Sequence, residues 1–129
     1  SRATLVSHYG IAEALRRARH AHLALVSCGD LSTRSLLVET QTVAENLDSL
    51  KKAGAIGDLL GVFLDASGKP VTHPLNERTM AISPLDLKAI PDSILASGGL
   101  NKAPIMRAIL SFGYVKRVVM DEDCAAAIL

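Results

Sequence analysis

The stretch SILASGGLNKAPIMRAIL, residues 93–110, decides the fold because it joins a strand pattern to a helix pattern through two glycines. Residues 93–96 are apolar enough for a buried strand, and apolar residues recur at helical spacing after the turn. We expect the helix to begin near Asn101, with Lys102 two or three residues inside it. A cation there faces the positive end of the helix dipole, which is unfavourable while no anion is bound.

Alternating helix and strand patterns continue on both sides of this stretch. Predicted helices cover residues 9–21, 42–54, 84–89 and 122–129, and further predicted strands cover residues 22–28, 59–64, 70–73, 79–82 and 117–120. We expect Thr42 and Asp121 to cap their helices, and Gly54 to end the helix that Thr42 begins. The alternation predicts an α/β fold, with a mostly parallel sheet and helices on both faces. Residues 59–64 and 70–73 are predicted to form one antiparallel hairpin, inserted into a single domain of residues 1–129.

Composition excludes several classes of function. The 129 residues carry a net charge of +1, with 14 basic and 13 acidic side chains. This balance gives no broad basic field, so we expect the chain by itself to bind neither nucleic acid nor an anionic membrane. Aromatic residues make up 3% of the chain, too few for the stacking platforms of single-strand binders. No apolar run approaches the length of a membrane span, and no signal peptide pattern is present, so we expect a cytoplasmic protein.

Cysteine and histidine positions argue against a metal site. Cys28 and Cys124 lie far apart in the sequence, and the four histidines show no metal-ligand spacing. Both cysteines are predicted to be small buried residues in a reducing compartment, with a disulfide as the less favoured alternative. We therefore expect no metal and no cofactor.

Three loops are candidates for the functional site, because ligands of open α/β sheets bind beyond the carboxyl ends of the strands. They are residues 28–35, the Gly57–Asp58 pair and residues 98–102. In the last loop, Gly98 and Gly99 let the backbone approach a ligand, and a helix N-terminus with a lysine beside it suits a phosphate or carboxylate. The alternative, weighed evenly, is that the glycines only turn the chain and that Lys102 points into water.

Carboxylates in the other two loops have a binding and a structural interpretation. Asp58 is placed to accept hydrogen bonds from two neighbouring hydroxyls, as a sugar presents them, although a turn or capping role is the commoner one. Asp30 follows Gly29 and precedes Ser32, and this loop could contact a ligand, although ordinary turn residues are favoured. Glu77 is the further carboxylate considered for acid–base chemistry.

Four stretches together resemble one protein family. They are KKAGAIGDLLGVFLDASGKPV, LNERTMAIS followed by LKAIP, ILASGGLNKAPIMRAIL, and VMDEDCAAAIL. In this order and spacing they resemble the effector-binding, or DeoR-like sugar-binding, domain of the SorC-type bacterial transcriptional regulators. The leading ALRRARHAHLALVSCGDL fits the same family.

The resemblance implies a fold like that of the glucosamine-6-phosphate and ribose-5-phosphate isomerases. It also implies a homo-oligomeric cytoplasmic regulator, not an enzyme, that binds a phosphorylated sugar or polyol. By the same resemblance Lys102, with Gly98 and Gly99, reaches the ligand phosphate, Asp58 contacts sugar hydroxyls, and Gly29–Asp30 matches a further contact loop. The family's DNA-binding helix-turn-helix and the first part of its effector domain have no counterpart in this chain.

Two other classes of function remain open at this point. The first is an aldose–ketose isomerase or deaminase of the same fold, which would need a carboxylate base within reach of a substrate carbon and an acid to protonate the carbonyl oxygen. The second is a purely structural dimerisation module, for which no ligand would have an effect.

Overall fold

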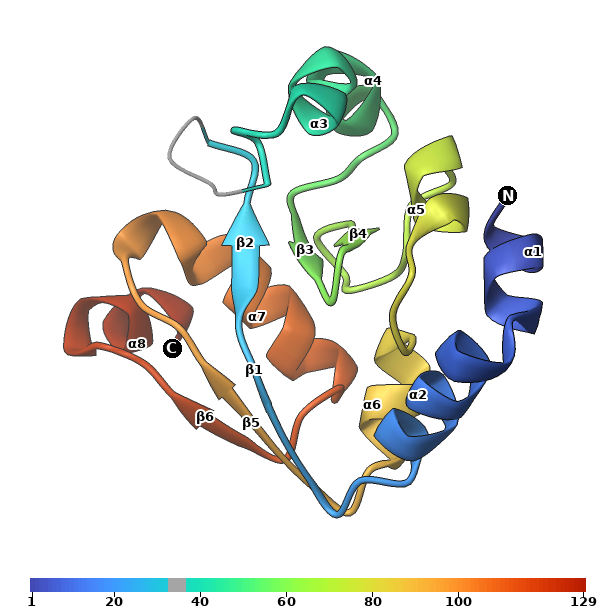
Figure 1. The fold of residues 1–129 in the computed structure, drawn as a ribbon. Coiled ribbons are helices and arrows are strands. Elements are labelled where there is room, and N and C mark those ends of the chain that lie inside the picture. Colours follow the sequence, from blue (N-terminus) through green and yellow to red (C-terminus); the bar gives the residue numbers. More distant parts are fainter. Residues whose placement is uncertain (33–36) are drawn as a thin grey trace.

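The computed structural model describes residues 1–32 and 37–129 (Figure 1). Its helices are α1 (Arg2–Ser7), α2 (Tyr9–Arg19), α3 (Gln41–Glu45), α4 (Leu47–Lys52), α5 (Pro74–Arg78), α6 (Pro84–Ala89), the 3-10 helix η1 (Leu100–Lys102), α7 (Ala103–Phe112) and α8 (Glu122–Ile128). Its strands are β1 (Leu23–Val26), β2 (Cys28–Asp30), β3 (Gly57–Leu59), β4 (Val62–Leu64), β5 (Asp92–Ala96) and β6 (Arg117–Val119). Within these ranges, no helix has the length and hydropathy that crossing a membrane requires.

A parallel sheet of three strands, in the order β1-β5-β6, forms one half of the fold. Leu25 lies beside Ile94, and Ile94 lies beside Arg117. On one face Leu95 is fully buried, in a core that also includes side chains of α6, α7 and α8. On the other face Leu25 is 72% exposed. The predicted α/β class is confirmed in a mixed form, because the described residues form one parallel and one antiparallel sheet of three strands each instead of a single, mostly parallel sheet.

An antiparallel sheet in the order β2-β3-β4 forms the other half, and it changes the predicted hairpin. Residues 59–64 are not one strand, because the chain reverses at Leu60 and Gly61, which have φ angles of 57° and 78°. Two residues in this conformation make a tight hairpin turn. The return predicted over residues 70–73 is only an isolated bridge between Leu64 and Pro70.

The outer edge of β4 is held by a side chain. Asn76 of α5 accepts a hydrogen bond from the Phe63 amide at 2.7 Å and donates to the Phe63 carbonyl at 3.0 Å and the Val71 carbonyl at 2.8 Å. Thus α5 shares the role expected of a returning strand with the Val71 amide, which also donates to the Phe63 carbonyl, at 3.0 Å.

Three further predictions were wrong in detail. The helix expected over residues 42–54 is two short helices, which meet at Asn46, and the first is capped at Thr40 instead of Thr42. The Asn46 side chain donates to the Thr42 carbonyl at 2.8 Å, so it competes with the helical backbone. Residues 79–82 form no strand, and α1 was not predicted. The predicted helix end at Gly54 and the predicted helix start at Asp121 are confirmed.

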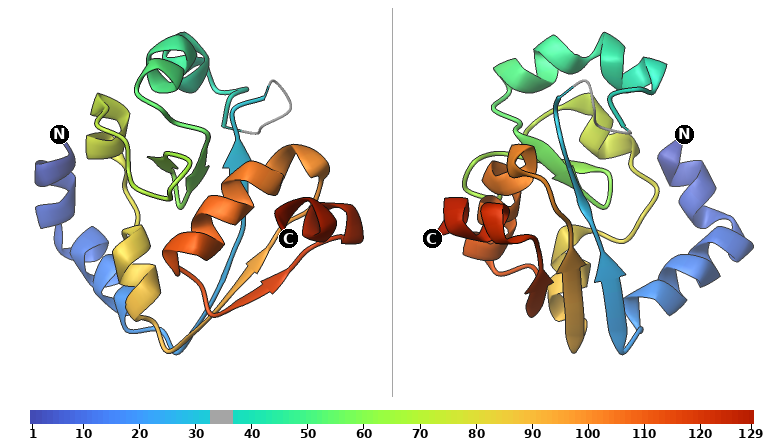
Figure 2. Two further views of the ribbon diagram at one scale, coloured as in Figure 1. Left: turned by 180° about the vertical axis from the view of Figure 1, so that it is seen from behind. Right: turned by 90° about the vertical axis from the view of Figure 1, so that its left-hand side faces the viewer.

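Helix α7 is the central packing element, and most of its inward residues are fully buried. It contacts β2, β3 and α8, and Figure 2 shows α8 beside it, with α1 and α2 on the opposite side of the molecule. The N-terminal end of α7 therefore lies where the parallel sheet, the antiparallel sheet and α8 meet.

Candidate functional site

The loop after β5 leads into α7 through a tight turn. Gly99 has a φ angle of 99°, which disfavours any residue with a side chain, and η1 follows it directly. Lys102 ends η1 and is the N-cap residue of α7, with φ −91° and ψ −5°. The prediction that Lys102 lies two or three residues inside the helix is corrected, since the intervening turn has 3-10 geometry.

The Lys102 ammonium is directed back along this loop. It is half-buried, and its Nζ donates to the Ser97 hydroxyl at 3.1 Å. Among residues 1–32 and 37–129, no carboxylate lies within ion-pair distance of it. A partly buried cation without a contacting carboxylate, beside a helix N-terminus, suits an external anion.

Asp58 lies on β3 and is 7% exposed. Its Oδ2 accepts a hydrogen bond from the Gly61 amide at 3.2 Å. Burial raises the pKa of Asp58 to about 6, although the Gly61 amide and the Lys102 charge act to lower it. The carboxylate is thus ionised at neutral pH at a cost in desolvation, and it retains acceptor capacity for a ligand hydroxyl.

Asp30 and Asp58 lie on neighbouring strands, but their side chains face opposite sides. Asp58 is opposite Gly29, and Asp30 is opposite Gly57. Residues that oppose each other share a face, and alternate residues change face. A Cβ atom on Gly57 would lie 2.7 Å from Ile105 of α7, so the face that carries Asp30 is the one packed on α7.

The Asp30 carboxylate is occupied by protein groups on that side. Asn101 donates to its Oδ2 at 3.0 Å, and the Ser32 hydroxyl donates to its Oδ1 at 3.0 Å. Asp30 therefore fixes η1, and the structural interpretation of this residue gains support. Of the loop predicted over residues 28–35, the first three residues form β2, and Thr33, Arg34 and Ser35 lie outside the described residues.

Asp121, a residue predicted only as a helix cap, also reaches the site loop. Its Oδ2 accepts a hydrogen bond from the Gly99 amide at 2.7 Å. A Cβ atom on Gly98 would lie 2.9 Å from the same oxygen. The Asp30–Asn101 and Asp121–Gly99 contacts join residues far apart in the sequence, and no local pattern signals either of them.

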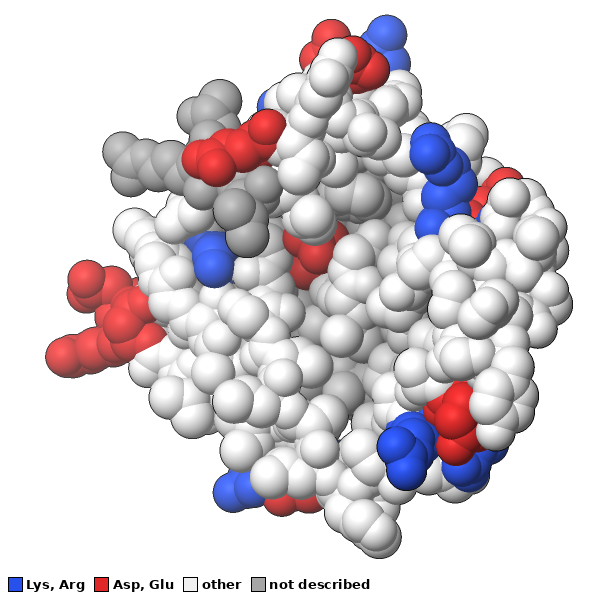
Figure 3. All heavy atoms as spheres, in the orientation of Figure 1, with Lys and Arg blue, Asp and Glu red and all other residues white. Residues whose placement is uncertain are grey.

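The molecular surface is hollowed on this side. Figure 3 shows acidic atoms at the bottom of a central hollow, with basic atoms near its margin. The Lys102 charge acts on the Asp58 carboxyl, Asp121 binds the Gly98–Gly99 turn at the Gly99 amide, and Gly29 lies opposite Asp58.

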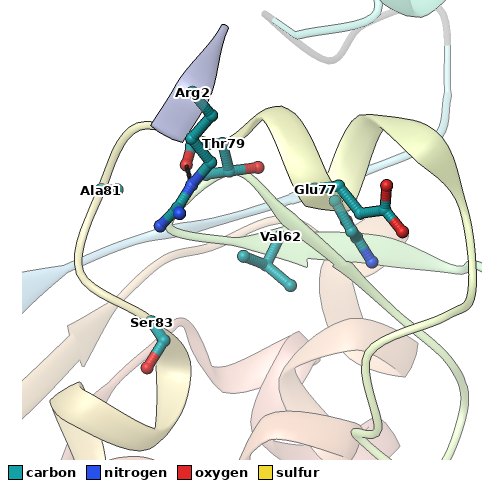
Figure 4. A pocket seen from close by; sticks show the side chains of 7 residues that line it. Arg2, Val62, Glu77, Thr79, Ala81 and Ser83 are labelled. Atoms are coloured by element: carbon teal, nitrogen blue, oxygen red, sulfur yellow. Dashed lines mark hydrogen bonds between the residues drawn. The ribbon is translucent and has the colours of Figure 1, made fainter. Parts of the chain in front are cut away.

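A separate cavity of about 360 Å³ lies between the start of α1 and the segment from α5 to α6 (Figure 4). Arg2 donates to the Thr79 carbonyl at 2.9 Å at its margin. Glu77, the second carboxylate considered for catalysis, lines this cavity, and Asp58 does not. The two carboxylates therefore belong to different surroundings.

Residues 1–129 match the family model "Putative sugar-binding domain". The chain belongs to this family. The sequence resemblance to the sugar-binding domains of SorC- and DeoR-type regulators is thereby confirmed. LsrR of Escherichia coli (strain K12), a transcriptional regulator, is 43% identical over 79 residues, which is 60% of this chain and 25% of LsrR.

Other members agree with this assignment. The deoxyribonucleoside regulator of Bacillus subtilis (strain 168) is 29% identical over 111 residues, or 86% of this chain and 36% of that protein. A DeoR family transcriptional regulator from Listeria monocytogenes superposes with a TM-score of 0.93 at 25% identity, over 99% of this chain and 52% of the other. Full-length SorC from Klebsiella pneumoniae, at 19% identity and a TM-score of 0.89, shares the fold over 99% of this chain and 42% of its own.

This sugar-binding domain therefore spans between a quarter and about half of these relatives. The relatives are transcriptional regulators, and the regulator from Listeria monocytogenes shares the fold described above over 99% of this chain.

Proposed function

We propose that this chain senses a phosphorylated sugar or polyol on behalf of a transcriptional regulator. Lys102, at the N-terminus of α7, holds the phosphate, and Asp58 orients sugar hydroxyls. The observation that carries the proposal is the position of Lys102, a partly buried cation at the N-terminus of a ten-residue helix, hydrogen-bonded to a neutral hydroxyl. An anion offsets the unfavourable placement of this charge.

Regulation follows from differential affinity. A ligand that binds one subunit arrangement of a homo-oligomer more tightly than another shifts the population toward that arrangement. DNA contact would come from a helix-turn-helix domain elsewhere in the regulator, which places its action in the cytoplasm.

The isomerase or deaminase alternative has less support. Such chemistry needs a second acid–base group within reach of the same substrate carbon as Asp58. Glu77 was the candidate, and it lines the cavity of Figure 4 with Arg2 instead. The curated relatives are regulators, which favours binding without turnover.

A thermal-unfolding screen tests the proposal. Aldose, ketose and polyol phosphates are each compared with their unphosphorylated parent compounds. A ligand at a hundred times its Kd should add about 2.7 kcal/mol of stability. Lys102→Ala should abolish the stabilisation by phosphorylated compounds, whereas Lys69→Ala, which removes an exposed lysine, should preserve it. If no phosphorylated compound stabilises the chain, or if Lys102→Ala keeps the full effect, the proposal is wrong.

A further inference from the structure

One carboxylate joins the site loop to the last helix. Asp121 follows β6 and is the N-cap residue of α8, where its Oδ1 accepts a hydrogen bond from the Cys124 amide at 2.9 Å. Its Oδ2 accepts from the Gly99 amide at 2.7 Å. These two backbone amides lower the pKa of Asp121, Gly99 having the larger effect. The two oxygens thus serve two different elements at once.

The glycines of the loop fit this carboxylate. A Cβ atom on Gly98 would lie 2.9 Å from Asp121 Oδ2, and a Cβ atom on Gly99 would lie 2.7 Å from Asn101 Oδ1. The Ser97 amide also donates to the Val119 carbonyl at 3.1 Å, just before Asp121. The loop is therefore attached to the β6–α8 connection at two successive points, and the glycines permit that close approach.

The position of Gly99 determines the position of Lys102. The Gly99 carbonyl accepts a hydrogen bond from the Lys102 amide at 2.9 Å, which closes the η1 turn. On the other side of the turn, Asn101 is fixed by Asp30 at 3.0 Å. The anion site is thus held between two carboxylates, one on β2 and one at the start of α8. The Gly99 amide, being bound to Asp121, is not offered to a ligand.

Helix α8 is sensitive to its cap. It has seven residues, and helices of this length are marginal without capping and tertiary packing. Cys124 is its one buried side chain, with its thiol 3.5 Å from the Met106 sulfur of α7. A shift of the Asp121 carboxylate would therefore weaken the first turn of α8.

We propose that Asp121 is a positioning residue of the anion site, which holds the loop of residues 97–102 in its binding conformation and couples loop occupancy to α8. The inference rests on the proposed function, since it takes the loop to be where an anion binds. Beyond that function, the site depends on a residue other than Gly98, Gly99 and Lys102, and the response to ligand passes to the C-terminal helix.

Substitution by serine separates the two hydrogen bonds of Asp121. Serine is a favoured N-cap residue, so Asp121→Ser keeps an acceptor for the Cys124 amide. Its single oxygen cannot serve the Gly99 amide as well. The matched control is Asp65→Ser, which removes one carboxylate from the turn that packs near the C-terminal end of α7.

Inorganic phosphate, titrated into the ¹⁵N-labelled chain at constant ionic strength, is the probe. In the wild-type chain we expect saturable amide shifts at Asn101 and Lys102, together with a shift of Cys124. In Asp121→Ser, the Gly99 amide should exchange with solvent faster before phosphate is added. The Kd should then be at least fivefold weaker, and the Cys124 response should be lost.

The direction of the change in Kd separates positioning from simple charge. Removal of a nearby negative charge, by itself, strengthens the binding of an anion. An unchanged or tighter Kd in Asp121→Ser would therefore overturn the inference, while the proposed function would stand. Absence of phosphate shifts in the wild-type loop would instead overturn the proposed function. Asp65→Ser should bind phosphate as the wild-type chain does.

Discussion

The C-terminal end of α7 is closed by packed side chains, whereas its N-terminal end is held by polar groups around a cation that has no carboxylate partner among residues 1–32 and 37–129. At the closed end, Tyr114 is fully buried and its hydroxyl donates to the Gly68 carbonyl at 2.6 Å. At the other end, Lys102 is half-buried and Asp58 is buried, and no ion pair joins the two side chains. The difference indicates that one end stabilises the fold, while the other retains a stability cost that a ligand can offset.

The largest expected effect comes from breaking the closed end. Gly68 has a φ angle of 86°, and a Cβ atom there would lie 2.6 Å from the Ala108 carbonyl oxygen. Gly68→Ala should lower the free energy of unfolding by roughly 4 kcal/mol, because backbone strain and overpacking add. Chemical denaturation measures this change.

Gly113→Ala is the matched control for that prediction. Gly113 ends α7 with the same φ of 86°, but a Cβ atom there meets no atom within 4 Å. Its cost should be about 1 kcal/mol, from backbone strain alone. Equal losses in the two variants would show that contact with α7 is not what closes this end.

A smaller effect of opposite sign is expected at the open end. Since the pKa of Asp58 is raised from 3.8 to about 6, the folded chain binds this proton more tightly than the unfolded chain does. Its contribution to stability is present below about pH 4 and is lost as the pH rises through 6. Asp58→Asn should therefore be more stable than the wild type by about 2 kcal/mol at pH 7.5, and by little at pH 4.

Unfolding free energies of both chains between pH 4 and pH 8 measure this difference. Asp65→Asn provides the contrast, because hydrogen bonding from Ser67 lowers the pKa of Asp65. That variant should lose stability at neutral pH instead of gaining it. A pH-independent difference between Asp58→Asn and the wild type would contradict the prediction.

The smallest effect concerns a single hydrogen bond. Tyr114→Phe removes the hydroxyl that donates to the Gly68 carbonyl and should cost about 1 kcal/mol. Tyr9→Phe, at a position 83% exposed, should change nothing measurable. Thermal unfolding compares the two variants. An equal loss of stability in Tyr9→Phe would show that the loss in Tyr114→Phe does not come from its buried hydrogen bond.

Sequence patterns predicted the β5–α7 unit well because its signals are local. An apolar strand, a glycine turn and a helix with Pro104 in its first turn are all visible within eighteen residues. The Leu60–Gly61 turn escaped prediction because leucine rarely adopts a positive φ, so the apolar run looked like one strand. The break at Asn46 is similar, since asparagine inside a helical pattern is only weakly unfavourable.

The site was predictable only in its local parts. Lys102 and Asp58 could be proposed from their positions after or beside strands. Asn101 with Asp30, and Gly99 with Asp121, are pairs that only the folded chain brings together. One sequence carries no signal for contacts between residues separated by 71 and 22 positions.

The hydrogen bonds of Asn76 bear on the tendency of the protein to aggregate. Exposed strand edges invite other chains to add to a sheet, and natural proteins block such edges. At β4 the outward amide and carbonyl of Phe63 are both taken by the Asn76 carboxamide. This side chain therefore protects the edge of β4 against edge-to-edge aggregation. A returning strand would have covered β4 but would itself have presented a new exposed edge.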